Sequence, residues 1–197
     1  MVRDILIWPD PRLKEKAKPV AAVDDALRKL IDDLFESMYA AEGVGLAAPQ
    51  VGALQRVVVI DASPRQEGQK PIALVNPVIL NPKGKATWTE GCLSIPGEAE
   101  EVDRAELVTV QALDREGKRI EIVDATGLLS IAIQHETDHL DGTLFVDHLS
   151  SLKREVIRRR MKKLKQDIAE GHDPRKEPGF PGAPGSDDEG EGEQPAL

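Results

Sequence analysis

The segment His135-Glu136-Thr137-Asp138-His139 carries residue types that can bind a metal and move a proton. On a helix, two histidines four positions apart lie one turn apart on the same face, so both imidazoles can reach one metal ion. The glutamate beside the first histidine can then take a proton from a metal-bound water. In the longer metalloprotease form of this motif a third histidine follows six residues later, and here that position is Phe145. The third ligand must therefore come from elsewhere in the chain.

The only cysteine, Cys92, is the candidate for that ligand. A lone cysteine is more often an inert buried side chain than a ligand. This one lies in the irregular segment EGCLSIPG, residues 90–97, where neighbouring backbone amides can point at a bound group. A thiol that coordinates a divalent metal is deprotonated outright to the thiolate. Two imidazoles and a thiolate suit zinc, iron(II), cobalt or nickel.

Each motif also has a plainer interpretation. The two histidines could hydrogen-bond backbone carbonyls, but Leu128, Ile131 and Ala132 extend their face of the helix as an apolar stripe, where unsatisfied polar groups are costly. A third motif, GVGLAAPQ at residues 43–50, has small residues that allow close approach of the backbone. Taken alone, it favours a simple connection between a helix and a strand.

The elements that must position these residues follow from hydrophobic periodicity. Helices are expected over residues 24–41, 126–142 and 150–170. Strands are expected at 56–61, 72–75 and 78–80, and a hairpin at 106–113 and 119–123. The N-terminal arm, which contains Pro9, Pro11 and Pro19, is expected to be extended over the surface. The fold class is α+β, with short antiparallel sheets and a hairpin packed around the central HExxH helix.

Composition indicates one domain in a reducing compartment. The chain has 197 residues, of which 40% are hydrophobic, enough for one core. A single cysteine forms no intramolecular disulfide, no apolar run reaches signal-peptide length, and none approaches the roughly 20 residues that span a bilayer. We expect a cytoplasmic protein that does not bind membranes. Its catalytic domain should cover residues 1–170, followed by a disordered, acidic, Gly/Pro-rich tail over residues 171–197.

Taken together and in this order, GVGLAAPQ, EGCLSIPG and HETDH resemble the peptide deformylase family. Its motifs GxGLAAxQ, EGCLS and HExDH are matched at every fixed position. The resemblance covers roughly residues 1–165 and is closest in kind to the bacterial type 1 form. It offers no role for the acidic tail.

The resemblance implies an activity and a set of site residues. Family members remove the formyl group from N-formylmethionine at the start of new bacterial proteins and release formate. Cys92, His135 and His139 would ligate the metal, with iron(II) the most active and zinc, nickel or cobalt as alternatives. Glu136 would act as general base and then as general acid. The side-chain amide of Gln50 and the backbone N–H of Leu93 would stabilise the oxyanion together with the metal.

The substrate is expected to bind as an added strand, which reads no side-chain sequence and suits an enzyme acting on almost every nascent chain. The backbone around Val44, Gly45 and Gly91 would pair with it. An apolar pocket for the methionine side chain would be formed by Val44, Leu128, Ile131 and Ala132, with Glu90 at its edge.

The third expected helix is strongly basic, although the whole chain has a net charge of -9, which argues against general or sequence-specific nucleic-acid binding. Residues 150–170 contain eight Lys or Arg against three acids. Most basic helices are solvated surfaces, but the matching helix of similar deformylases docks on ribosomal RNA near the exit tunnel. We therefore expect the helix over 151–170 to dock on the ribosome. The acidic tail could fold back and compete for it.

Two rival functions share parts of this pattern. An HExxH zinc endopeptidase would need another third ligand, for which Glu155 is the conceivable substitute; peptides with and without a formyl group separate the two activities. A non-catalytic binder of ribosomes or nascent chains would be expected to have lost Glu136 or a metal ligand, and all are present.

Overall fold

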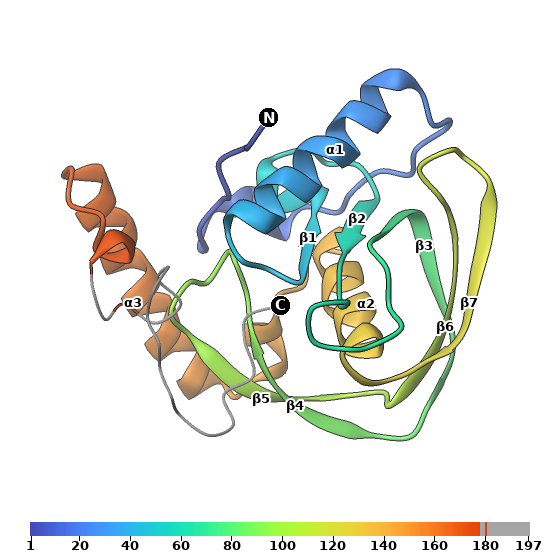
Figure 1. The fold of residues 1–197 in the computed structure, drawn as a ribbon. Coiled ribbons are helices and arrows are strands. Elements are labelled where there is room, and N and C mark those ends of the chain that lie inside the picture. The colour runs from blue at the N-terminus through green and yellow to red at the C-terminus, as the bar shows by residue number, and fades with distance from the viewer. Residues whose placement is uncertain (178–179, 181–197) are drawn as a thin grey trace.

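The computed structural model describes residues 1–177 and 180, and over these residues it forms two antiparallel sheets and three α-helices (Figure 1). The five-stranded sheet has the order β1-β2-β3-β6-β7, and β4 pairs with β5 in a separate two-stranded sheet. The helices are α1 (Asp25–Ala40), α2 (Gly127–Leu140) and α3 (Ser151–Ala169). The strands are β1 (Gly45–Ala47), β2 (Val57–Ile60), β3 (Ile72–Lys83), β4 (Ala86–Gly91), β5 (Ala99–Arg104), β6 (Leu107–Leu113) and β7 (Arg119–Ala125). The predicted α+β class is confirmed.

Strand β2 is buried on both faces, which explains its unbroken Val57-Val58-Val59-Ile60 run. Val57 and Val59 belong to the apolar cluster that contains the buried face of α1. Val58 and Ile60 belong to the cluster that contains α2. The sheet therefore separates α1 from α2, and α2 lies in the interior with its histidines (Figure 1).

Strand β3 is one element, whereas the sequence predicted two short runs. The register with β6 shifts between Val75 and Val78, and Asn76 has a left-handed φ of 53°. The Asn76 side chain accepts a hydrogen bond from Val20 N–H (2.8 Å) and donates one to Val20 O (2.8 Å). The bulge therefore bends the strand and ties the N-terminal arm to the sheet.

The β4–β5 hairpin was not predicted. Its strands mix charged and apolar residues, so the alternation that marks a strand is weak. The hairpin matters because β4 leads directly into Cys92.

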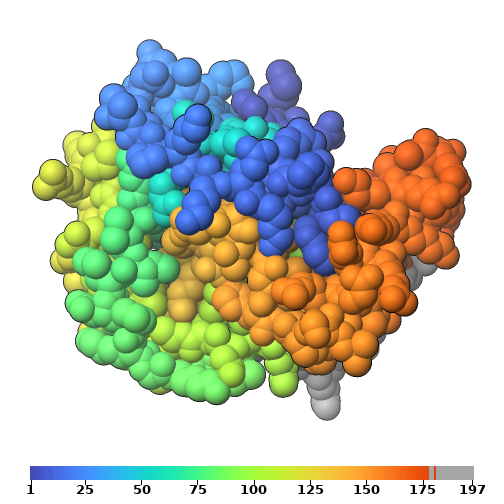
Figure 2. Space-filling view, turned by 180° about the vertical axis from the view of Figure 1, so that it is seen from behind, coloured from blue at the N-terminus to red at the C-terminus, as the bar shows by residue number. Residues whose placement is uncertain are grey.

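The N-terminal arm contacts the segments on either side of the candidate site. Leu6 N–H donates to Gln50 O (2.8 Å), and Trp8 N–H donates to Ser94 O (2.9 Å). Trp8 and Leu13 are buried in an apolar cluster with Met161 of α3, and Figure 2 shows the arm, in dark blue, lying beside the orange C-terminal helix. The expected surface arm is thus also a packing element.

The tail that the sequence predicts to be disordered from Gly171 is described only as far as Glu177 and at Phe180. A short 3-10 helix covers Pro174–Lys176, and Phe180 joins the same apolar cluster as Trp8. Residues 178–179 and 181–197 lie outside the described part. None of the helices described is both long and apolar enough to cross a membrane.

Candidate metal centre

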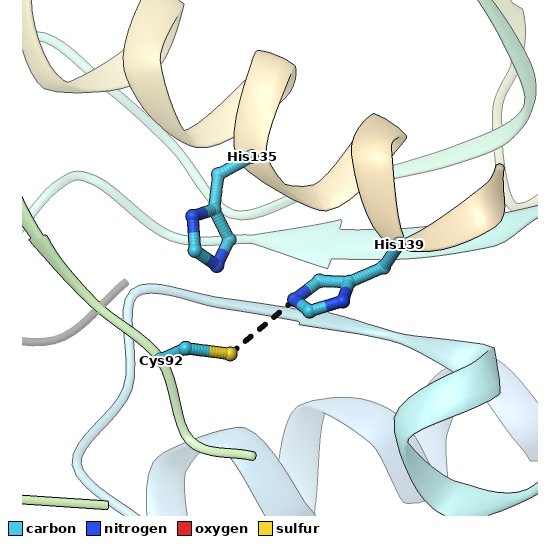
Figure 3. A group of neighbouring side chains, drawn as sticks. All are labelled: Cys92, His135 and His139. Atoms are coloured by element: carbon cyan, nitrogen blue, oxygen red, sulfur yellow. Dashed lines mark hydrogen bonds between the residues drawn. The ribbon is translucent and has the colours of Figure 1, made fainter. Parts of the chain in front are cut away.

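Helix α2 and the end of β4 bring Cys92, His135 and His139 together (Figure 3). The two histidines lie one turn apart on α2, with ring centroids 5.0 Å apart. Cys92 follows β4, and its Sγ lies 3.4 Å from His139 Nε2. One potential ligand atom from each residue lies within 4.8 Å of the others, and all three side chains are buried. The three side chains are therefore close enough to hold one metal ion together.

The unsatisfied polar atoms around this cluster test whether a metal fits. Among the described residues, buried atoms without a hydrogen-bond partner include His135 Nε2, His139 Nδ1 and both carboxyl oxygens of Glu136. Leaving such groups buried and unpaired is costly. His135 Nδ1 is instead paired with Glu90 Oε2 at 2.9 Å, which leaves Nε2 facing the cluster. A divalent cation suits this donor set, and hydrogen bonding of both histidines to backbone carbonyls is not observed.

Burial sets the protonation states that the site has by itself. Burial raises the pKa of the Cys92 thiol, and the Glu136 carboxyl raises it further. Burial also raises the pKa of Glu136 well above its usual value. Burial, followed by the neighbouring His135, lowers the pKa of His139. A neutral imidazole is the form that binds a metal, and coordination deprotonates a thiol.

A buried charge network holds His135 from behind. Arg104 of β5 donates to both carboxyl oxygens of Glu90, at 2.7 and 2.9 Å, and to Asp138 Oδ2 at 2.6 Å. His148 lies 2.8 Å from the same Asp138 oxygen. Burial alone would raise the pKa of Glu90, but hydrogen bonds from Arg104 and His135 lower it to about 2. Glu90 is therefore an ionised partner that fixes the His135 ring.

Sequence reasoning missed Arg104, Asp138 and His148 as parts of this site. Asp138 lies inside the HExxH segment but was given no role, and Arg104 is one of many arginines. Glu90 was expected at the edge of the methionine pocket; in the structure its side chain is fully buried and contacts Arg104 and His135. The position of Glu90 directly before Gly91-Cys92 was the one sequence feature that could have indicated a role beside the candidate metal ligands.

The glycines of GVGLAAPQ allow close approach to the site. A Cβ built on Gly45 would lie 2.4 Å from Glu136 Oε1, and one on Gly43 would lie 2.7 Å from Leu93 Cδ1. Both distances are too short for real side chains. The segment is therefore more than the simple connection that it suggested when taken alone, since it forms β1 and lies directly against the glutamate.

Gln50 lies beside the thiol. Its Nε2 is 3.6 Å from Cys92 Sγ and donates to Ser94 Oγ (3.2 Å), while its Oε1 accepts from Ala47 N–H (2.8 Å). The orientation of the amide is therefore fixed, with its N–H groups toward the cluster. Leu93 is half-buried next to Cys92.

A cavity of about 180 Å³ lies one helical turn before His135. It is lined by Ala86, Trp88, Glu106, Thr126, Gly127 and Ile131. Of the expected pocket residues, only Ile131 lines this cavity, while Val44, Leu128 and Ala132 are buried in the adjoining core. Trp88 was missed because the β4 strand was not predicted.

Two edge strands lie on either side of this region. In the part of the chain that is described, β1 pairs only with β2, and β4 pairs only with β5. Gly45 and Gly91 lie in these two strands. Glu155, the alternative third ligand, is on α3, where it pairs with Arg158 and Arg159.

An α+β fold with a buried Cys-His-His cluster and an adjacent glutamate defines a metal-dependent hydrolase of the HExxH class. Residues 2–155 match the polypeptide deformylase family. The peptide deformylase of Alkalilimnicola ehrlichii is 57% identical over 164 residues, which cover 83% of this chain and 90% of that protein. That of Hydrogenovibrio crunogenus is 52% identical, covering 85% of this chain and 95% of that protein. The chain belongs to the peptide deformylase family.

Solved structures agree. The crystal structure of a peptide deformylase from Legionella pneumophila has a TM-score of 0.79 and 50% identity, covering 86% of this chain and 98% of that one. A peptide deformylase from Ehrlichia chaffeensis in complex with actinonin has a TM-score of 0.78 and 40% identity, covering 82% and 96%. The protein is thus a metal-dependent enzyme that removes the N-formyl group from new polypeptides. This assignment replaces both rival functions.

Proposed function

We propose that Cys92, His135 and His139 hold the metal of this deformylase. Two observations support the proposal. One potential ligand atom of each residue lies within 4.8 Å of the others, and His135 Nε2 has no hydrogen-bond partner among the described residues. When bound, a divalent metal supplies a Lewis acid that activates water and polarises the formyl carbonyl.

Glu136 is proposed to move the proton. It takes a proton from the water that attacks the formyl carbon, and it delivers that proton to the amine nitrogen as the C–N bond breaks, leaving formate and a free N-terminus. Its buried carboxyl has no partner among the described residues and lies against the backbone of Gly45. That confinement favours one orientation, toward the cluster.

Gln50 and Leu93 are proposed to stabilise the oxyanion that forms on attack. The Gln50 amide is oriented beforehand by Ala47 and Ser94, so its N–H groups need no rearrangement during the reaction. The Leu93 backbone N–H follows Cys92 directly and would be the second donor.

The substrate is proposed to add a strand between the edges of β1 and β4, pairing with the backbone near Val44, Gly45 and Gly91. The methionine side chain would enter the cavity lined by Ile131 and Trp88. Main-chain pairing explains tolerance of many sequences, and the apolar cavity explains selection of the first residue.

Iron(II) is proposed as the native metal, in keeping with one thiolate and two imidazoles. Anaerobic purification followed by metal analysis, with formate release measured on formyl-Met peptides, tests this. We expect one iron per chain, and no hydrolysis of the corresponding N-acetylated peptides. Zinc at full occupancy with higher turnover than the iron form would contradict the assignment of iron.

The basic surface of α3 is proposed to dock on the ribosome in the cytoplasm, with residues 1–170 as the catalytic unit. Lys162 and Lys163 are exposed and form no ion pair with a described residue. Changing both to Gln should weaken ribosome sedimentation and reduce its salt dependence. Lys70→Gln with Lys118→Gln is the matched control, because these exposed lysines lie outside α3. Equal loss in both pairs would argue against docking through α3.

A further inference from the structure

The last described residue, Phe180, is fixed beside the metal-site loop. A Cβ built on Gly97 would lie 3.0 Å from Phe180 Cζ. The Phe180 ring packs on the apolar cluster that contains Cys92, Ile95 and Met161. Phe180, after which residues 181–197 follow in the sequence, therefore has a defined position next to this loop and α3.

That position adjoins the basic helix. A cavity of about 480 Å³ lies between the 96–98 loop, α3 and the segment after it, and both Phe180 and Lys163 line it. The neighbouring Arg160 is occupied by Glu98 at 2.9 Å, and Lys165 lies 3.9 Å from Asp10. Lys162 and Lys163 have no such acidic partner in the described part of the chain. The two unpaired ammonium groups thus lie on the helix beside which Phe180 is anchored.

The residues after Phe180 have complementary charge. The segment 181–197 contains five acids and no base: Asp187, Asp188, Glu189, Glu191 and Glu193. The first acid, Asp187, is seven positions after Phe180, a span of at most about 25 Å. A 19-residue helix such as α3 is about 28 Å long. The acids therefore start within reach of Lys162 and Lys163.

We infer that the acidic segment 181–197 binds the Lys162/Lys163 surface of α3 and competes there with RNA phosphates. The inference deepens the proposed ribosome docking, which uses the same surface. The contact between the two segments of the chain does not itself require a ribosome. Because the segment is tethered, its effective concentration at α3 is high even though each ion pair is weak. Ribosome docking would then require a high local density of RNA phosphates, which displaces the carboxylates of residues 187–193 from α3.

The first test measures the contact directly. A zero-length carbodiimide reagent joins carboxylates to amines in contact, and peptide mass spectrometry locates the products. We expect products between residues 187–193 and Lys162 or Lys163 in the full chain. A variant with Asp187→Asn, Asp188→Asn, Glu189→Gln, Glu191→Gln and Glu193→Gln should give none. A control with the order of residues 181–197 shuffled keeps the charge and should still give them. Products spread evenly over the exposed lysines would overturn the inference.

The second test measures competition with a labelled single-stranded RNA by fluorescence anisotropy at low salt. The chain ending at Phe180 and the neutralised variant should bind about 3- to 10-fold more tightly than the full chain, and the difference should shrink as salt rises. The shuffled control should match the full chain. Equal RNA affinity in all four proteins would overturn the inference. Binding to purified ribosomes is measured separately by sedimentation. Absence of ribosome binding would contradict only the proposed docking of α3, and not the contact between residues 181–197 and Lys162/Lys163. Turnover of a short formyl-Met peptide should be unchanged in every variant.

Discussion

At the scale of single residues, the metal site is a group of buried polar atoms that face one another without partners. His135 Nε2 and the Glu136 oxygens are unpaired among the described residues, while His135 Nδ1 on the far side of the ring is paired with Glu90, which Arg104 holds in turn. Such a division is stable only if a bound group completes the inner side. The roles of the inner residues can be separated by substitution.

Cys92→Ala should lose the metal while the chain still folds. The thiol is proposed as the third ligand, and an apolar methyl group fits its buried surroundings. Metal content of the anaerobically purified variant measures this, with circular dichroism as the check on folding. Full metal occupancy together with undiminished turnover would rule out Cys92 as a ligand.

Glu136→Gln should keep the metal and lose turnover by roughly 100-fold or more, because the amide preserves shape but cannot take a proton. The pair of measurements, metal content and kcat, distinguishes it from the cysteine variant. Activity near that of the parent protein would mean that another group moves the proton.

Gly45→Ala should lower kcat without releasing the metal. The added Cβ would lie 2.4 Å from Glu136 Oε1, so the carboxyl must move. We expect a loss of about 10-fold or more, since displacement of a catalytic group by about 1 Å can cost 100-fold. Gly68→Ala is the control, because nothing lies within 4 Å of the added Cβ. The φ of 83° at Gly68 adds local backbone strain in this control. Unchanged kcat in Gly45→Ala would show that Glu136 has room to adjust.

At the scale of elements, Arg104 joins the two-stranded sheet to α2. Its guanidinium is almost fully buried and pairs with Glu90 of β4 and Asp138 of α2. Most other ion pairs are at the surface, such as Lys83 with Asp124, where solvent weakens them. The Arg104 network is therefore the polar contact that sets the position of β4, and with it Cys92, relative to the histidines.

Arg104→Met should destabilise the fold by about 3–5 kcal/mol, because it leaves the Glu90 carboxylate buried without its main partner. Adding Glu90→Gln should recover part of the loss. Urea unfolding measures both, and Lys83→Met, which breaks a surface pair, should cost less than about 1 kcal/mol. If the Arg104 and Lys83 variants lost equal stability, the network would have no special role.

At the scale of the whole molecule, the N-terminal arm is attached to α1 by charge. The buried Asp33 carboxylate accepts hydrogen bonds from the Met1 amine (2.8 Å), Lys29 (2.9 Å) and Arg3 (2.8 Å). These partners, with the amine contributing most, hold the pKa of Asp33 well below its usual value. The arm also contacts Gln50 and Ser94 through Leu6 and Trp8, so this attachment helps to hold the arm beside the site.

Asp33→Asn should lower stability near pH 7, and the difference should disappear in acid. Because the pKa of Asp33 in the native state lies below the unfolded value of about 3.9, its contribution is fully present above that value. It is lost as pH falls through the native pKa. Urea midpoints of the two proteins should differ by a constant amount above about pH 4, and the difference should begin to shrink between about pH 4 and about pH 3. A difference that stayed constant over this lower range as well would show that the charge of Asp33 contributes nothing.

Motif spacing and hydrophobic periodicity were enough to predict the candidate chemistry and the three α-helices. HExxH spacing on an apolar helix and a single cysteine in EGCLS identified the three cluster residues, because side chains four apart on a helix must share a face. The α1 pattern gave its boundaries to within about a residue, since Asp24 caps it as expected. Local rules were sufficient for these helices, but not for the β4–β5 hairpin, whose strands are also close along the chain.

The contacts that hold the site in place could not be predicted from local sequence patterns. Arg104 lies 14 residues from Glu90 and 34 from Asp138, and no local pattern links them. The Trp88 side of the cavity and the packing of Phe180 on Gly97 likewise depend on contacts between segments distant along the chain. Periodicity reports which face of an element is buried, whereas the partners of that face are chosen by packing of the whole chain.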